Sequence, residues 1–227
     1  VLAAHPDDES LGAGGLVARL RGVGARVTVL LCTAGEASHP DSPTTTPEQL
    51  AAVRLQEFGG ALAHLLPDPD WRFLALPDGR LADHRQELHT ALQHAIADAA
   101  AWGLPPERIT LVAPYRHDGH TDHEALGAAA AEAAGAGGHG LLEYPIWYWL
   151  WADAADQAWQ SWLRLAPPAG GAAAGLDDFE QARGALAATD AHGDHHILDA
   201  APLAFDQRVT HQARARHAVR VADRDRA

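Results

Sequence analysis

Lysine and methionine are absent from this chain of 227 residues, and cysteine occurs once, as Cys32. A single thiol excludes a framework of intrachain disulfides, so a reducing compartment is the expectation. The chain has no run of about 18 consecutive apolar residues and no basic-then-apolar start, which argues against a transmembrane helix and a signal peptide. We therefore expect a soluble cytoplasmic protein. Since no initiator methionine precedes the apolar run Val1 to Ala4, the natural first strand is expected to be cut short here.

Positive charge is scarce as well. The formal net charge is -13 at pH 7, which argues against nucleic acid or an anionic membrane surface as a partner, because both need a basic face. A small neutral or cationic substrate fits this charge better. Hydrophobic residues make up 47% of the chain, which is enough for the core of one large domain or of one domain with an appendage.

Short apolar runs alternate with helical patterns in the first two thirds of the chain, which is typical of an α/β fold with a parallel sheet. Strands are expected at 26–32, 71–76, 108–112 and 141–147, and helices at 11–20, 46–66, 83–102 and 121–134. Helix starts are indicated by three cap patterns, which are Thr46 with Gln49, Asp83 with Gln86, and Thr121 with Glu124.

The turn His5-Pro6-Asp7-Asp8-Glu9 gathers one imidazole and three carboxylates directly after the first apolar run. Catalytic zinc typically takes three ligands from His and carboxylates and leaves a fourth position for water. His5 and Asp8 can converge on one ion while Asp7 points elsewhere, as a general base beside the metal would. The alternative is that the acidic residues only cap a helix, where the macrodipole favours them.

A second polar cluster, residues 117–123 with the sequence HDGHTDH, follows the strand expected at 108–112 and can supply a third ligand. Both clusters come just after strands, where open α/β sheets place their sites. Asp122 and His123 are expected in the first turn of the helix 121–134. The positive end of that helix favours the neutral imidazole that binds metals.

Other segments keep more than one interpretation. Five of the seven tryptophans lie at 147–162, where they cover the core or a subunit interface, or stack on a sugar at the mouth of a pocket. A weaker candidate for a metal site consists of His192, Asp194, His195 and His196. We expect a linker at 166–175, a short helix at 178–188 and a poorly packed Arg-rich end from residue 208.

These residues resemble the LmbE-like (PIG-L) family of metal-dependent N-acetylglucosaminyl deacetylases. The matching elements, in the family's order within residues 1–162, are AHPDDE at Ala4–Glu9, TAGE at Thr33–Glu36, Arg54 with Glu57, PDG at Pro77–Gly79 and HTDH at His120–His123. The resemblance implies a Rossmann-like three-layer α/β sandwich with a mostly parallel sheet, formed by a deacetylase domain at 1–165 with 166–227 appended to it. It also implies a hydrolase that removes an acetyl or related acyl group from an amino sugar, such as an N-acetylglucosaminyl glycoside, with Zn²⁺ or another divalent ion such as Fe²⁺.

The resemblance also implies roles for individual residues. His5, Asp8 and His123 match the family's metal ligands. Asp7 matches the general base, and His120 matches the imidazolium that stabilises the oxyanion. Asp122 fits a residue that orients an imidazole, while Arg54 and Asp78 match positions that contact sugar hydroxyls.

Alternatives to this function remain open. Some relatives have a tyrosine two residues before the oxyanion histidine, where this chain has Asp118. The loop Ser38–Pro43 resembles a subgroup fused to a methyltransferase, a partner domain that would lie outside this chain because no glycine-rich cofactor fingerprint occurs in it. A homo-oligomer is also left open. The rival functions are an amidase of the same fold acting on a larger thiol-sugar conjugate, and an inactive metal-holding module that binds sugar.

Overall fold

The computed structural model describes residues 1–152, 162–165 and 217–221. Strands in this part of the chain form two hydrogen-bonded sheets, with the orders β1-β2-β3 and β4-β5-β7-β6. The first sheet consists of β1 (Leu2–Ala3), β2 (Thr28–Leu31) and β3 (Asp70–Phe73). The second consists of β4 (Thr110–Pro114), β5 (Gly140–Tyr144), β6 (Trp162–Leu165) and β7 (His217–Val221).

The pairing is mostly parallel, as predicted. It is parallel within β1, β2 and β3 and between β4 and β5, and antiparallel where β7 joins β5 and β6. Because β1 also lies alongside β4, the spatial order across both sheets is β3-β2-β1-β4-β5. This is the strand order with which doubly wound Rossmann folds begin. The predicted Rossmann-like architecture is therefore confirmed, with the sheet divided into two hydrogen-bonded parts.

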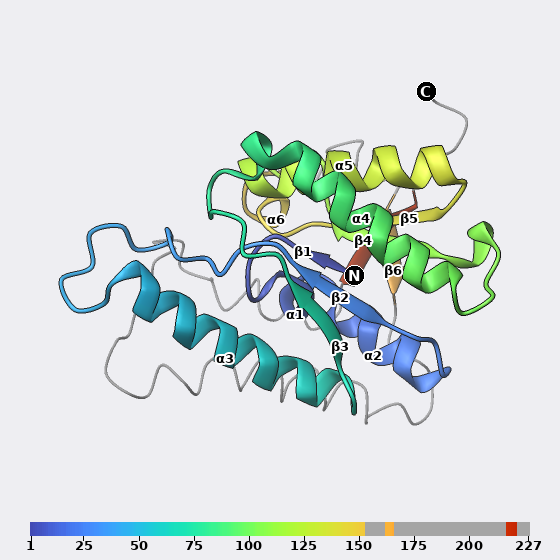
Figure 1. Ribbon diagram of the computed structural model, residues 1–227, viewed down its shortest axis with the longest axis horizontal. Coiled ribbons are helices and arrows are strands. Elements are labelled where there is room, and N and C mark those ends of the chain that lie inside the picture. Colours follow the sequence, from blue (N-terminus) through green and yellow to red (C-terminus); the bar gives the residue numbers. More distant parts are fainter. Residues whose placement is uncertain (153–161, 166–216, 222–227) are drawn as a thin grey trace.

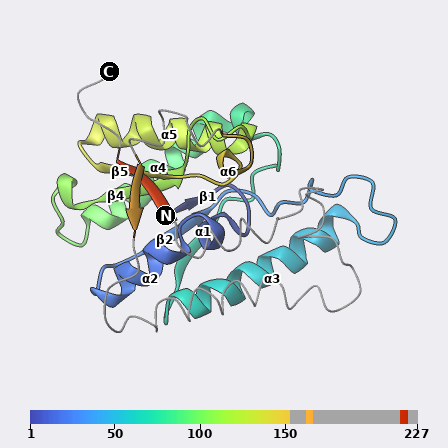
Figure 2. The same ribbon diagram turned by 180° about the vertical axis from the view of Figure 1, so that it is seen from behind.

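Helices cover both faces of the strands (Figure 1). One face carries α2 (Gly14–Gly22) and α3 (Pro47–Leu65), and the other carries α4 (Arg85–Ala100) and α5 (Thr121–Gly137). Figure 2 shows the same three layers from behind. The short helices are α1 (Asp8–Leu11), α6 (Tyr148–Trp151) and the 3₁₀ turns η1 (Leu81–His84) and η2 (Pro106–Arg108).

Two apolar cores follow from the alternation of side chains along each strand. Leu2, Leu30 and Leu111 belong to the core beneath α4 and α5. Their chain neighbours Ala3, Leu31 and Val112 belong to the core shared with α2 and α3. Burial on both faces explains why these strands are continuous apolar runs in the sequence.

The predicted helix at 11–20 is divided in the structure, because α1 ends at Leu11 and α2 begins at Gly14. A Cβ on Gly12 would lie 2.1 Å from the ring of Tyr144, so only glycine fits at this junction. The close approach places the junction of α1 and α2 against β5.

Two of the three predicted helix caps differ from the structure. Thr46 and Gln49 form the predicted capping box of α3. The cap predicted at Asp83 is wrong, because residues 81–84 form a 3₁₀ turn in which Asp83 pairs with Arg80. The cap predicted at Thr121 is also wrong. His120 is the N-cap of α5, and its side chain accepts the N–H of Asp122.

The C-terminal expectations are tested at few positions. Residues 217–221, which lie in the end expected to be poorly packed, form β7 beside β5. The expected linker at 166–175, the helix at 178–188 and the group 192–196 lie outside the described residues, and the division at residue 165 stays a prediction. Within the described residues, no helix has both the length and the apolar character needed to cross a membrane.

Candidate metal centre

The two polar clusters meet at the carboxyl ends of β1 and β4. The turn 5–9 follows β1, and the cluster 117–123 follows β4 and extends into the first turn of α5. Since β1 and β4 are neighbours from which the strand order runs outward in opposite directions, their carboxyl ends form the switch point of the fold. The topology thus joins two segments that are more than 100 residues apart.

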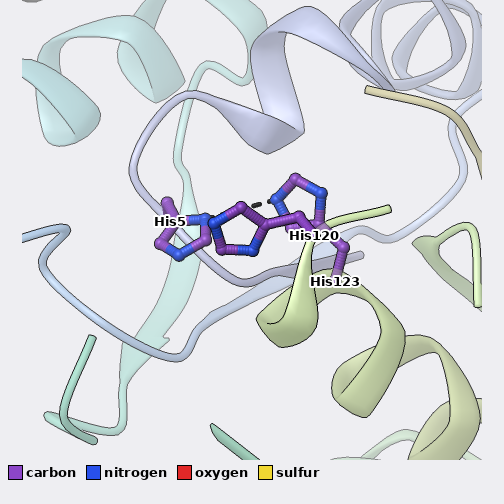
Figure 3. Close-up of side chains that lie close together, drawn as sticks. All are labelled: His5, His120 and His123. Atoms are coloured by element: carbon purple, nitrogen blue, oxygen red, sulfur yellow. Dashed lines mark hydrogen bonds between the residues drawn. The ribbon is translucent and has the colours of Figure 1, made fainter. Parts of the chain in front are cut away.

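The three residues predicted to bind metal bring their ligand atoms together there. His5 Nδ1 lies 3.3 Å from His123 Nε2 and 3.6 Å from an oxygen of Asp8, while the other Asp8 oxygen lies 3.3 Å from His123 Nε2. Metal–ligand bonds of about 2.0–2.1 Å in a tetrahedron place neighbouring ligand atoms roughly 3.3 Å apart. His5, Asp8 and His123 are therefore spaced as ligands of one ion. Figure 3 shows the histidine rings, with His5 in the turn after β1 and the other two at the start of α5.

Two other groups of ligand atoms also lie within 4.8 Å of one another, namely His5 with His120 and His123, and His5 with Asp78 and Asp122. The second group surrounds His5 Nε2, which is 3.0 Å from Asp78 and 3.2 Å from Asp122. A histidine that binds metal through one nitrogen usually donates the other N–H to a carboxylate. This arrangement assigns Nδ1 of His5 to the ion and Nε2 to the carboxylates.

Asp8 is held by the backbone of its own turn. Its Oδ2 accepts the N–H groups of Ala4 and His5 at 2.9 and 3.0 Å, which leaves Oδ1 directed at His123. Burial works against the charge of this carboxylate, but His123 and His5 hold its pKa well below the usual range. Asp8 is thus a buried anion with one oxygen available to a cation.

Asp118 orients His123, a role that the sequence analysis missed. Its Oδ2 lies 2.6 Å from His123 Nδ1, so the neutral ring carries its proton on Nδ1 and leaves Nε2 for the ion. Burial alone would lower the pKa of His123, but Asp8 and Asp118 raise it to about 9. The sequence shows that Asp118 lies beside the HTDH motif, but it does not show which side chain Asp118 contacts.

Asp122 and Asp78 both lie on the far side of His5. Asp122 accepts the N–H groups of Gly79 and Leu81, at 2.8 and 3.0 Å, and its side chain therefore joins α5 to the loop after β3. This position matches the predicted orienter of an imidazole. Asp78 has only 8% of its side chain exposed, and its second oxygen accepts the N–H of Ala37. Both carboxylate oxygens of Asp78 therefore contact protein groups in this structure.

Arg54 is buried beneath the turn. Its guanidinium donates to the carbonyls of Pro6 and Gly35, at 2.8 and 3.1 Å, and to Asp7 at 3.2 Å. Gly35 has φ of 67°, and a Cβ there would lie 1.8 Å from the guanidinium. The glycine of the TAGE element thus makes room for Arg54, which connects this loop to Asp7.

Asp7 has a strained backbone and a side chain that reaches the surface. Its φ is 134°, a conformation that non-glycine residues rarely adopt and that is common at active sites. Asp7 stands at the N-cap of α1, but its carboxylate forms no cap hydrogen bond with that helix. Its side chain is 32% exposed. Removal from water raises its pKa to about 6, with Arg54 acting in the opposite direction and Asp8 in the same direction.

His120 forms one wall of the cluster. Its ring centroid is 4.8 Å from that of His5, 4.6 Å from that of His123 and 5.0 Å from that of Trp147. Burial lowers the pKa of His120, and the neighbouring imidazoles of His123 and His5 lower it further. Since its Nδ1 accepts the N–H of Asp122, a neutral ring carries its proton on Nε2.

Comparisons with known proteins identify a family and several similar enzymes. The profile of the PIG-L family, described as GlcNAc-PI de-N-acetylase, matches residues 1–134. The chain is 30% identical over 174 residues to the 1D-myo-inositol 2-acetamido-2-deoxy-alpha-D-glucopyranoside deacetylase of Nocardia farcinica, covering 66% of this chain and 56% of that protein. It is 35% identical over 141 residues to the enzyme of the same name from Geodermatophilus obscurus, covering 53% and 47%. The chain thus spans about half the length of these relatives.

A solved structure shows the same fold. The N,N'-diacetylchitobiose deacetylase from Pyrococcus horikoshii superposes with a TM-score of 0.61 over 98% of this chain and 82% of that one. Sequence identity in this match is 15%, so the match concerns the fold alone.

Proposed function

Because the chain belongs to the PIG-L family, we propose that it is a metal-dependent hydrolase that removes an N-acyl group, such as acetyl, from an amino sugar. The observation that carries the proposal is the convergence of His5 Nδ1, His123 Nε2 and the Asp8 carboxylate at spacings of one ion. The deacetylase names of the relatives support the reaction class. The net charge of -13 favours a neutral amino-sugar glycoside over a polyanionic substrate.

The donor set of two imidazoles and one carboxylate suits Zn²⁺, with Fe²⁺ as the alternative. His5, Asp8 and His123 would hold the ion. When bound, such an ion polarises a carbonyl and lowers the pKa of water to about 7. Asp118 would keep Nε2 of His123 unprotonated, and Asp78 and Asp122 would do the same for Nδ1 of His5 by accepting its other N–H.

Asp7 is the proposed general base. It accepts a proton from the attacking water as the carbon–oxygen bond forms, and it returns the proton to the amine as the carbon–nitrogen bond breaks. A pKa of about 6 suits this role, since the group is ionised at neutral pH yet binds a proton readily. Arg54 fixes the position of the carboxylate from the buried side.

His120 is the proposed donor to the developing oxyanion. The N–H of Asp122 points at its Nδ1, so Nε2–H of the neutral ring is the donor available to the substrate. The imidazolium expected from the resemblance stays a prediction; burial and the neighbouring imidazoles lower the pKa of His120 in the site without its metal. A fixed neutral donor still stabilises the tetrahedral oxygen, since it does not need to reorient as charge develops.

Several finer expectations stay predictions. Contacts of Arg54 and Asp78 with sugar hydroxyls would have to form beside the protein contacts that both residues already make. A cytoplasmic location, a methyltransferase partner domain outside this chain and a homo-oligomer are likewise untested.

Acetate release from a panel of N-acetyl amino sugars tests the proposed function. The protein is loaded with Zn²⁺ or Fe²⁺ and compared with the Asp7→Asn variant, which keeps the proposed ligands. Release that depends on both metal and Asp7 is the expected result. Hydrolysis restricted to a thiol-sugar amide would support the rival amidase, and sugar binding without release by either metal form would support the inactive module.

A further inference from the structure

We propose that Trp147 is a stacking platform for the sugar ring of the substrate, presented by a rim that we define as residues 146–151. The proposal rests on the proposed function for the identity of the ligand, and it adds a binding residue that neither the motifs nor the metal geometry assigns. It follows from how the rim is anchored, what it exposes and which side chain it touches.

The rim is anchored to the metal centre by Asp118. The buried Asp118 carboxylate accepts the N–H groups of Ile146, Trp147 and Tyr148 at 2.9 to 3.0 Å. Its backbone carbonyl accepts the indole N–H of Trp151 at 2.8 Å. The same carboxylate binds His123, so the rim and the metal ligand share one support. Such a support preorganises the backbone of the rim, so that less backbone freedom remains to be lost on binding.

The rim nevertheless leaves large aromatic surfaces open. Trp147 is 47% exposed and Trp151 is 55% exposed. A tryptophan that only covered the core would be buried, since its indole carries a large apolar surface. The interpretation of Trp147 as a cover of the core is therefore not supported by its exposure.

Trp147 lies next to the reacting position. Its ring contacts that of His120 edge-to-face at a centroid distance of 5.0 Å. In the proposed reaction His120 donates to the oxygen of the scissile amide, and the nitrogen of that amide is bonded directly to the sugar ring. The sugar ring must then lie beside His120, within reach of the Trp147 indole. The C–H groups on one face of a pyranose are suitable partners for the electron-rich face of an indole.

The test compares Trp147→Ala and Trp147→Phe with Trp102→Ala. Trp102 is a matched control, because it is 39% exposed and lies under Arg26, outside the rim. Binding of N-acetylglucosamine is measured by titration calorimetry on the zinc-loaded protein, in an Asp7→Asn background that prevents turnover. We expect Trp147→Ala to weaken binding roughly 2- to 10-fold, Trp147→Phe to retain most of it, and Trp102→Ala to leave it unchanged.

Steady-state kinetics on Trp147 variants that keep the native Asp7 separate stacking from a purely structural contact. If Trp147 is a stacking platform, the Trp147→Ala substitution raises KM and changes kcat little. A fall in kcat with unchanged KM and unchanged binding would show that Trp147 only supports His120, and would overturn the proposal. So would a dimer, seen by analytical ultracentrifugation, that Trp147→Ala dissociates while sugar binding is unaffected.

The binding measurement also separates this proposal from the proposed function. If the unaltered protein releases no acetate but its sugar binding depends on Trp147, the deacetylase proposal fails and the platform stands. If acetate is released and Trp147→Ala binds sugar normally, the platform fails and the deacetylase proposal stands.

Discussion

The turn 5–9 and the cluster 117–123 supply the same metal centre but are held in different ways. In the turn, several of the supporting contacts are local. Asp8 accepts N–H groups from Ala4 and His5, and Glu9 accepts the N–H of Asp7 at 3.2 Å. Local contacts therefore define part of the geometry of the turn, and Arg54 adds a distant contact to Pro6 and Asp7.

The cluster 117–123 depends on distant segments instead. Asp118 accepts N–H groups from the rim 146–151, and Asp122 accepts N–H groups from Gly79 and Leu81. These partners are separated from the cluster by 28 to 43 residues of chain. A change at Asp7 or Asp8 should therefore act directly on the base or on a ligand, whereas a change at Asp118 or Asp122 should act through the orientation of an imidazole.

The largest expected effect separates the neighbours Asp7 and Asp8. Asp7→Asn should keep metal near stoichiometric while turnover falls by roughly 10² to 10⁴, because the proton acceptor is lost. Asparagine also tolerates a positive φ better than most residues. Asp8→Asn should instead lower metal content, since a neutral amide replaces an anionic ligand. Elemental analysis and acetate release on both variants check this, and the opposite pattern of metal loss would exchange the two roles.

His120→Ala should reduce turnover by about 10² to 10³, the usual effect of deleting one oxyanion donor. Metal content should be unchanged, because His120 is not among the three proposed ligands. The measurements are kcat with N-acetylglucosamine and zinc content. Loss of zinc from this variant would instead favour the group His5, His120 and His123 as the ligand set.

Asp118→Asn tests whether the second cluster acts by orientation. Zinc affinity, measured by competition with a chelator, should fall about 10- to 100-fold, because the carboxylate no longer orients His123. The control is Asp83→Asn, which removes an exposed carboxylate paired with Arg80. An unchanged affinity in Asp118→Asn, with the fold intact by circular dichroism, would show that His123 does not need this partner.

Asp78→Asn distinguishes a contact with His5 from a contact with sugar. If Asp78 supports the imidazole from which it lies 3.0 Å, zinc affinity should fall on the order of 10-fold or less while KM stays nearly constant. An increase in KM at full zinc occupancy would instead support the predicted contact with sugar hydroxyls. Chelator competition and steady-state kinetics on one preparation give both quantities.

The smallest effect is expected outside both clusters, at the start of α3. Thr46→Ala removes one half of a capping box and should lower the free energy of unfolding by about 1 kcal/mol. Metal affinity and kcat should not change, because this cap lies apart from the ligands. Urea denaturation measures the stability, and a loss of zinc binding in this variant would show that α3 is coupled to the site through Arg54.

The sequence alone determined those features that depend on neighbouring residues. The apolar runs of the parallel strands, the capping box of α3 and the ligand types in the two motifs could all be predicted, because each follows from side chains a few positions apart. Long-range contacts decided the rest. Asp83 and Thr121 look like caps, but the 3₁₀ turn at 81–84 and the side chain of His120 take their places.

Only the tertiary structure revealed which partner each polar side chain has. Asp118 and Asp122 belong to one short motif, yet the first orients His123 while the second lies against His5, 117 residues away in the chain. Sequence spacing cannot separate these roles, because a carboxylate binds whichever donor the fold brings within about 3 Å. The motifs thus specified the chemistry of the site, and the adjacency of β1 and β4 decided how its residues are paired.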